Sequence, residues 1–199
     1  MHPRNPVLTQ FLSSLHKAIL SKAMVGGEAH RVIDRIMSAL SNPEAPANPT
    51  AHSVPACALL ETAVDNVVGD AAVVEHARAL QALAPSLAWW QRSDAGKIGE
   101  PFASGHANAT LIGPGGLEER DDVWVGVSLL APEIEYPVHH HPPEEVYMVL
   151  SPGQWQQDNG DWHEPGMGGI VHNPPDILHA MRSSSKPLLA TWCLLTLAA

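Results

Sequence analysis

Residues 136–147 read YPVHHHPPEEVY, and this stretch decides the fold. Side chains alternate between the two faces of a β-strand, so His139 and His141 point the same way while the histidine between them points the opposite way. Glu145 and Tyr147 are also two positions apart and share a face of the following strand. With a Pro-Pro turn between the two strands, the pattern predicts that two imidazoles, a carboxylate and a phenol converge on one point.

A second pattern of the same kind follows further along the chain. Residues 168–179 run from a glycine through a Pro-Pro-Asp turn to His179. The turn predicts a strand that carries this single histidine inward. Because neutral imidazole is the commonest metal ligand in proteins, the two patterns together indicate a metal site.

The first half of the chain has the periodicity of helices. Apolar residues recur at helical spacing from Val7 to Ile19, from Val32 to Leu40 and from about Ala56 to Leu83. Gly69-Asp70 is expected to divide the third region in two. Residues 42–50 contain three prolines and indicate an extended connector.

Near Gly96 the pattern changes to short apolar runs separated by Gly, Pro and Asn. Asn159-Gly160 is the strongest hairpin signal in the chain, and a two-residue turn there would place Asp158 opposite Asp161. Many short strands without alternating helices predict a barrel or sandwich. We therefore expect a mainly β fold in two parts, a helical region at 1–95 that packs on the barrel and a β-barrel with the metal site at 96–199. Strands are expected at residues 123–130, 145–150, 154–158, 161–164, 169–172 and 187–195.

The composition argues against several classes of protein. The 199 residues include 11 Lys and Arg against 21 Asp and Glu, and the net charge of −10 argues against a nucleic-acid partner, which needs a basic footprint. No run approaches the ~20 apolar residues that cross a bilayer, so no membrane partner is expected. Cys57 and Cys193 indicate neither a disulfide framework nor a thiolate metal site, which favours a reducing, cytoplasmic location. Histidine is the unusual entry in the composition, because its 12 residues outnumber Lys and Arg together.

The two histidine patterns resemble the paired motifs of the cupin superfamily, whose fold is a double-stranded β-helix or jelly-roll barrel. The first motif, His-x-His-x3-Glu, begins at His139, and the second, Gly-x5-Pro-x-(Gly or Asp)-x2-His, ends at His179. The glycine that closes the first motif is Gly153, one residue later than usual. Asp176 stands where glycine is typical, and Asp tolerates the positive φ of such a turn better than most residues.

A more specific resemblance rests on Tyr136, the block His139–Tyr147, the helical first half and the total length. These features are similar to the cupin-type dimethylsulfoniopropionate (DMSP) lyases of the Q type. Members of that family cleave DMSP to dimethyl sulfide and acrylate with a bound divalent metal and a tyrosine base. The resemblance implies a bacterial carbon–sulfur lyase whose partner is this small-molecule substrate.

The same resemblance implies roles for individual residues. Tyr147 would lie in or beside the coordination sphere and act as the base, and Tyr136 would line the pocket near the substrate. His139 would be either a metal ligand or a neighbour of the substrate. The metal ligands would be His141, Glu145 and His179.

These residue types suit the elimination. The proton to be removed lies next to a carboxylate and is weakly acidic, so a metal that holds the carboxylate would stabilise the charge that develops. Free tyrosine, with a pKa of about 10, is a poor base at neutral pH, and a nearby metal favours its phenolate. After residue 100 the only basic side chains are Arg120, Arg182 and Lys186, so we expect the metal to receive the anionic group. Zn, Fe(II), Mn, Co and Ni all accept such N/O ligands.

Other functions suit the same residues. Two or three histidines with one carboxylate also fit an Fe(II) dioxygenase acting on a small organic acid, and a non-catalytic cupin that binds a small ligand is a third reading. In the lyase, the sulfonium group would be held over an aromatic face. The apolar helices are candidates for a lid, a homodimer interface, or both. Four tryptophans fall on predicted strands, namely Trp124, Trp155, Trp162 and Trp192.

Overall fold

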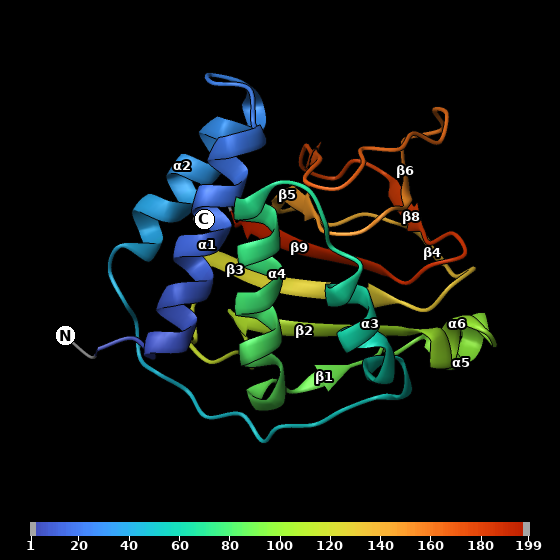
Figure 1. The fold of residues 1–199 in the computed structure, drawn as a ribbon, viewed down its shortest axis with the longest axis horizontal. Coiled ribbons are helices and arrows are strands. Elements are labelled where there is room, and N and C mark those ends of the chain that lie inside the picture. The colour runs from blue at the N-terminus through green and yellow to red at the C-terminus, as the bar shows by residue number, and fades with distance from the viewer. Residues whose placement is uncertain (1–2, 197–199) are drawn as a thin grey trace.

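The computed structural model describes residues 3–196. Helices from the first half of the chain cover one face of a large antiparallel sheet, and a small sheet packs on its other face (Figure 1). This confirms the predicted order of helices followed by an antiparallel β-structure.

The strands agree with most of the expected positions. Expected residues 161–164 do not form a strand, and two strands before residue 113 were not predicted. One of these reads HANATLI, in which alanines and polar residues give little strand signal. The strands are β1 (Trp89–Trp90), β2 (His106–Ile112), β3 (Val123–Leu130), β4 (Glu135–His139), β5 (Glu144–Val149), β6 (Gln154–Gln157), β7 (Ile170–Asn173), β8 (His179–Arg182) and β9 (Leu188–Leu195).

The two sheets bring distant parts of the sequence together. The larger sheet has the order β1-β2-β3-β9-β5-β7, and the smaller has the order β4-β8-β6. Every pairing between these strands is antiparallel. As a result β4 and β5, which follow one another in sequence, lie in different sheets, and the short segment between them crosses from one sheet to the other.

The predicted helices are present, and the third helical region is divided as expected. Gly69 has a φ of +100°, and the side chain of Asp70 then accepts a hydrogen bond from the N–H of Ala72 at 2.9 Å, which caps the next helix. The helices are α1 (Pro6–Lys22), α2 (Glu28–Leu40), α3 (Leu60–Asp65), α4 (Ala71–Leu83), α5 (Ala95–Ile98) and α6 (Phe102–Gly105), with 3-10 turns η1 (Pro55–Leu59) and η2 (Ala84–Ser86).

Alternation along the strands creates two cores. On β3, Val125 and Val127 point toward the helices and join one large apolar cluster with them. Gly126 and Ser128 point the other way, toward the smaller sheet, where Ser128 lines a cavity and the Trp192 ring packs over Gly126. The inner face of the larger sheet is therefore the face on which polar residues are available for chemistry.

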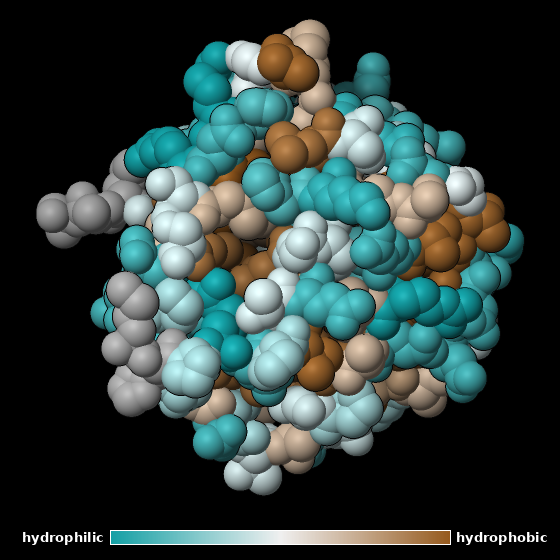
Figure 2. All heavy atoms as spheres, turned by 60° about the vertical axis from the view of Figure 1, so that its left-hand side comes forward, coloured by the Kyte–Doolittle hydropathy of each residue, from teal (hydrophilic) through white to brown (hydrophobic). Residues whose placement is uncertain are grey.

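The outer side of the helices is largely hydrophilic. Figure 2 brings the side with α1 and α2 forward and shows mainly hydrophilic side chains, with apolar ones in separate places. Met24 and Val25, in the turn between these helices, are 79% and 84% exposed. Among the helices of residues 3–196, none is long and apolar enough to cross a membrane.

The hairpin at Asn159-Gly160 has a different register from the predicted one. Across the loop that follows β6, Trp155 and His163 exchange two backbone hydrogen bonds of 2.9 Å, whereas a two-residue turn at Asn159-Gly160 would place Trp155 opposite Glu164. Asp158 lies in this loop with a φ of +50°, and its N–H donates to the carbonyl of Leu178 at 2.6 Å. The prediction that Asp158 faces Asp161 is wrong. Asp158 lies in the turn and its N–H bonds to the residue before β8, so it does not pair with the other arm of the hairpin.

His76 links the helical layer to the larger sheet. It is fully buried on α4, between Ser14 of α1 at 3.1 Å and Thr191 of β9 at 2.9 Å. The Ser14 hydroxyl donates to the carbonyl of Phe11, so His76 donates from Nδ1 to Ser14 and accepts at Nε2 from Thr191. Burial lowers the pKa of His76 to about 3, which keeps the ring neutral.

Candidate metal centre

Three histidines from the two sequence patterns meet between the sheets. His139 ends β4 and pairs across the strands with His179 of β8, while His141 follows the end of β4. One ring nitrogen from each of the three lies within 4.8 Å of the other two. His140 points away, as alternation predicts, and its exposed ring lies 3.6 Å from Asp176.

The backbone fixes the tautomer of all three rings. Each Nδ1 donates a hydrogen bond to a carbonyl two residues away, at 2.9 to 3.0 Å, and this leaves each Nε2 with a free lone pair. Such a bond also orients the ring and makes the free nitrogen a better metal ligand. The pairs are His139 with Pro137, His141 with Pro143, and His179 with Ile177.

Glu145 of β5 places a carboxylate beside these nitrogens. Its Oε2 lies 3.3 Å from Nε2 of His179 and 3.5 Å from Nε2 of His141. Asn173 of β7, its partner across the strands, donates to the same oxygen at 2.8 Å. Gln157 in turn donates to Asn173 at 2.7 Å, so the carboxylate is held in place by two amides in series.

The donor atoms have the spacing that one bound cation requires. Ligands about 2.1 Å from a tetrahedral metal lie roughly 3.4 Å from one another, which matches the distances from Glu145 to His141 and His179. Nε2 of His179 is buried and has no hydrogen-bond partner among residues 3–196. A buried lone pair that faces a carboxylate is costly unless a cation or proton lies between them, so the residues fit a metal ion.

The protonation states agree with a cation-binding site. Burial lowers the pKa of His139 to about 4, helped by the neighbouring His179, whose own pKa burial also lowers. Burial alone would raise the pKa of Glu145, but His141, His179 and Asn173 hold it below its ordinary value. His141 differs, because the Glu145 carboxylate raises its pKa against the effect of burial. At neutral pH the site therefore presents a carboxylate and at least two neutral imidazoles.

Both tyrosines of the chain line the same cavity. Tyr147 of β5 follows Glu145 on the same face, and burial, reinforced by that carboxylate, raises its pKa well above the ordinary value. Tyr136 of β4 lies with its ring 5.0 Å from that of His139, and burial raises its pKa as well. With no metal ion at the site, each phenol therefore keeps its proton at neutral pH.

The cavity at this site has a volume of about 260 Å³ and an aromatic wall. Trp90, Trp124 and Trp192 line it, while Trp155 lies buried against Tyr147 with their rings 6.3 Å apart. Of the four tryptophans on predicted strands, only Trp124 and Trp192 line the cavity, where they could contact a sulfonium group. Trp90, on the unpredicted β1, is a third.

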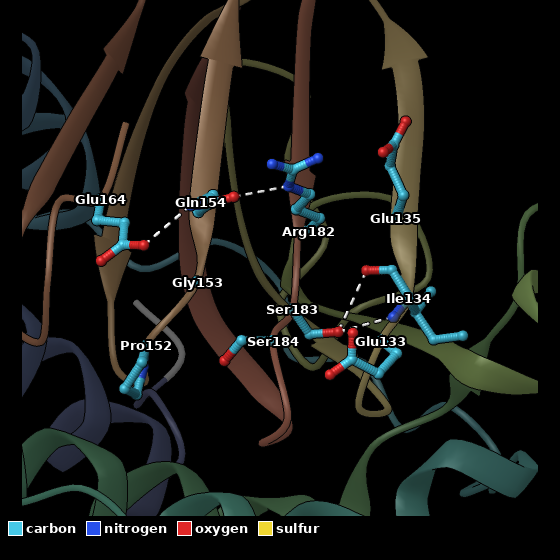
Figure 3. Close-up of a pocket in the computed structure, with 10 residues that line it drawn as sticks. All are labelled: Glu133, Ile134, Glu135, Pro152, Gly153, Gln154, Glu164, Arg182, Ser183 and Ser184. Carbon is cyan, nitrogen blue, oxygen red and sulfur yellow. Dashed lines mark hydrogen bonds between the residues drawn. The ribbon is translucent and has the colours of Figure 1, made fainter. Parts of the chain in front are cut away.

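Arg182 lines a different hollow, and Trp162 packs against its guanidinium. This hollow, of about 430 Å³, lies along the smaller sheet beside Glu133, Glu135 and Glu164 (Figure 3). Arg182 donates to Gln154 at 2.7 Å, and its guanidinium lies 4.1 Å from the centre of the Trp162 ring. Its position explains why this cation does not serve the metal cavity.

The remaining basic residues of the barrel also lie elsewhere. Arg120 is paired with Asp122 at 2.8 Å, and Lys186 is exposed. One cation from before residue 100 does approach the site, since the guanidinium carbon of Arg92 lies 5.4 Å from the centre of the Tyr136 ring. The count of basic residues after residue 100 did not include Arg92. Its bidentate pair with Asp94 offsets its positive charge.

Asp176 has the positive φ expected of it, +59°. Glu144 lies 2.7 Å from Nε2 of His172, which is not one of the candidate metal ligands. Asn173, which does support a candidate ligand, was missed because only the pairing of β5 with β7 places it opposite Glu145.

Two facing antiparallel sheets, with the histidines of both motifs meeting between them, define a cupin whose site is compatible with a metal ion. Residues 28–190 match the model of the dimethylsulfoniopropionate lyase family. The chain therefore belongs to this family and is a carbon–sulfur lyase.

Individual relatives agree with this assignment. The chain is 28% identical over 139 residues to dimethylsulfoniopropionate lyase DddQ of Ruegeria pomeroyi, covering 69% of this chain and 68% of the relative. The crystal structure of DMSP lyase DddQ from the same organism superposes with a TM-score of 0.76 at 22% identity, over 96% of this chain and 92% of that one. A structure from a study of the DMSP lyases RdDddP and RnDddQII gives a TM-score of 0.69 at 20% identity, with the same coverage. At these identities the two structures establish the shared fold.

Proposed function

We propose that this protein cleaves dimethylsulfoniopropionate to dimethyl sulfide and acrylate in a metal-dependent β-elimination. Membership of the lyase family supports the substrate. The arrangement of three Nδ1-protonated histidines around Glu145 supports the dependence on a metal. The single observation that carries the proposal is the buried Nε2 of His179, which has no hydrogen-bond partner within the described part of the chain and faces the Glu145 carboxylate at 3.3 Å.

In this proposal His141, Glu145 and His179 hold the ion, and His139 is a fourth ligand or a neighbour of the substrate. A bound divalent ion supplies a Lewis acid that stabilises negative charge on the substrate carboxylate and favours the tyrosine phenolate. The fixed Nδ1 bonds keep the imidazoles turned toward the ion, so little reorganisation is needed when it binds.

Tyr147 is the proposed base. Its phenolate oxygen takes the proton from the carbon next to the carboxylate, the carbon–carbon double bond of acrylate forms, and the carbon–sulfur bond breaks. Dimethyl sulfide leaves with the electron pair of that bond, so no oxidant is required. Burial raises the pKa of Tyr147 in the absence of a cation, and the proposal therefore requires the base and the ion to act together.

Tyr136 and the aromatic wall are proposed to position the substrate. The Tyr136 phenol lies beside His139 at the edge of the metal cluster, where it lines the cavity. Trp90, Trp124 and Trp192 offer faces over which a sulfonium cation is stabilised. This places the two charges of the substrate in different surroundings, the carboxylate near the ion and the sulfonium near the indoles.

An anaerobic assay separates the lyase from the alternatives. The metal-loaded protein is incubated with DMSP with and without oxygen, and dimethyl sulfide and acrylate are measured by gas chromatography and NMR. We expect equal amounts of both products and equal rates in the two atmospheres. A requirement for oxygen would favour the dioxygenase. If neither product forms, DMSP is not the substrate, and the cupin acts on or binds another small molecule.

Two further expectations stay predictions. We propose a cytoplasmic location, which cell fractionation tests. A homodimer formed through the helical layer is tested by sedimentation velocity, where a monomer at micromolar concentration would exclude a stable dimer.

A further inference from the structure

Asn108 is a buried polar residue in the metal cavity that the proposed mechanism does not use. It lies on the inner face of β2 and is 3% exposed. Ser128, the residue opposite Asn108 on the neighbouring strand β3, donates a hydrogen bond of 2.6 Å to Oδ1 of Asn108. The Nδ2 group has no hydrogen-bond partner among residues 3–196. The Asn108 amide is therefore held at one end and presents a free N–H donor at the other.

Leaving such a donor unpaired is expensive. A buried N–H without an acceptor costs about 1–3 kcal/mol, and nearly all such groups in folded proteins are paired. A second unpaired donor, the indole Nε1 of Trp124, lies on the wall of the same cavity. Two unpaired donors on residues that line one cavity indicate a ligand that brings hydrogen-bond acceptors.

The surroundings of Asn108 favour an acceptor with negative charge. Asn108 and Tyr136 line the same cavity, and the guanidinium carbon of Arg92 lies 5.4 Å from the centre of the Tyr136 ring. The sulfonium end of DMSP carries no acceptor, whereas its carboxylate has two oxygens that together accept about four hydrogen bonds. A carboxylate can therefore use the Asn108 donor and still have lone pairs for other partners.

We propose that Asn108, held in place by Ser128, donates a hydrogen bond to the substrate carboxylate and determines the specificity of the cavity for an acid. This inference rests on the proposed function only for the identity of the substrate. The recognition of a small carboxylate by Asn108 is a separate property that binding alone can measure.

Two sets of variants test the role. Asn108→Asp keeps the size of the side chain but replaces the donor by a negatively charged acceptor. The double variant Asn108→Leu with Ser128→Ala replaces both hydrogen-bonding partners by apolar groups, a change that is nearly neutral for folding when neither partner is left alone. Asn42→Asp, at an exposed position of the connector, is the control for added charge.

The binding experiment uses two half-substrates on the metal-loaded proteins. Acrylate has the carboxylate without the cation, and trimethylsulfonium has the cation without the carboxylate. By titration calorimetry we expect Asn108→Asp and the double variant to bind acrylate at least tenfold more weakly, with trimethylsulfonium binding as tight as before or tighter. In turnover of DMSP the KM should rise at least tenfold, with a smaller change in kcat.

The outcomes separate this inference from the proposed function. Unchanged acrylate affinity, or an equal loss for both half-substrates, would overturn the role of Asn108, and a fall in melting temperature alone would show that the residue is structural. If the wild-type protein releases no dimethyl sulfide, the proposed function fails, while the acrylate result still decides whether Asn108 binds a carboxylate. If the double variant does not fold, Asn108→Asp alone decides the question.

Discussion

Nε2 of His179 lies 3.3 Å from Oε2 of Glu145, and both side chains are 3% exposed. Since Nδ1 of His179 already donates to the Ile177 carbonyl, the facing nitrogen carries a lone pair rather than a proton. Two lone pairs at this distance in a buried site repel one another. A cation between them turns this repulsion into two metal–ligand bonds, so loss of either residue should remove the ion.

Substitution of His179 or Glu145 by alanine is predicted to abolish metal binding. After incubation with metal and desalting, mass spectrometry of the elements should find close to one ion per wild-type chain and almost none in either variant. His140→Ala is the matched control, because this neighbouring histidine is exposed and points away from the cluster. Retention of a full ion by the Glu145 variant would contradict the assigned ligand set.

Asn173→Leu should weaken metal binding without removing a ligand. The substitution keeps the branched shape and the number of heavy atoms of the side chain but deletes the N–H that holds Oε2 of Glu145 at 2.8 Å. Loss of such a supporting contact typically costs 10–100-fold in metal affinity. Competition with a chromogenic chelator measures this change, and an unaltered affinity would show that Glu145 is oriented by the strand alone.

Tyr147→Phe is predicted to abolish turnover while the fold and the metal remain. The phenyl ring keeps the contact with Trp155, but the oxygen that takes the proton is lost. We expect kcat to fall by at least 10²-fold, the lower bound for loss of a positioned general base. Circular dichroism and metal content serve as controls, and a variant that keeps more than a tenth of the wild-type kcat would exclude Tyr147 as the base.

Gly126→Ala should damage the cavity through Trp192. A Cβ at residue 126 would overlap the six-membered part of the Trp192 indole, which packs directly over this glycine. The same Cβ would overlap the carbonyl oxygen of Ala109 on β2, so the ring and this part of β2 must both move, and we expect a raised KM for DMSP together with a shift in tryptophan fluorescence. Gly96→Ala is the control, since a Cβ there meets nothing within 4 Å. Equal kinetics for the two variants would show that the position of Trp192 does not matter.

His76 should make stability depend on pH in a defined window. Its folded-state pKa of about 3 is below the ordinary 6.5, so the unfolded chain takes up a proton that the folded chain refuses. The stability contributed by the neutral ring is complete above about pH 6.5 and is lost as the pH falls toward 3. Between pH 5.5 and 4, the free energy of unfolding of the wild type should fall about 1.4 kcal/mol per pH unit more steeply than that of His76→Gln. Urea unfolding at several pH values, with chelator present in both proteins, measures the two slopes, and parallel curves would contradict the prediction.

The sequence predicts the strand faces at the site well and the supporting contacts poorly. Alternation correctly places His139 and His141 together and His140 outside, although His141 lies just beyond the end of β4, whose pairing with β8 is irregular between Tyr136 and His139. The histidines and the glutamate of the motifs are only a few residues apart, so strand alternation and the turn between the strands bring them together. The spacing within each motif was therefore sufficient to identify these residues.

Residues that reach the site from other parts of the fold could not be found in this way. Asn173 meets Glu145, and Asn108 meets Ser128, only through the order of strands in the larger sheet. Arg92 arrives from the end of the helical half to lie beside Tyr136. The predicted register of the hairpin near Asn159 was also wrong. The observed register includes a backbone hydrogen bond of Asp158 with Leu178, which no local sequence pattern shows.

Metal-dependent cleavage of DMSP is tested by removing and restoring the metal while dimethyl sulfide is measured in the headspace. We expect that chelator-treated protein releases none, that added divalent metal restores release, and that the rate rises in proportion to bound metal up to one ion per chain. Undiminished release from protein shown to be free of metal, or no release from protein that carries a full ion, would contradict this expectation.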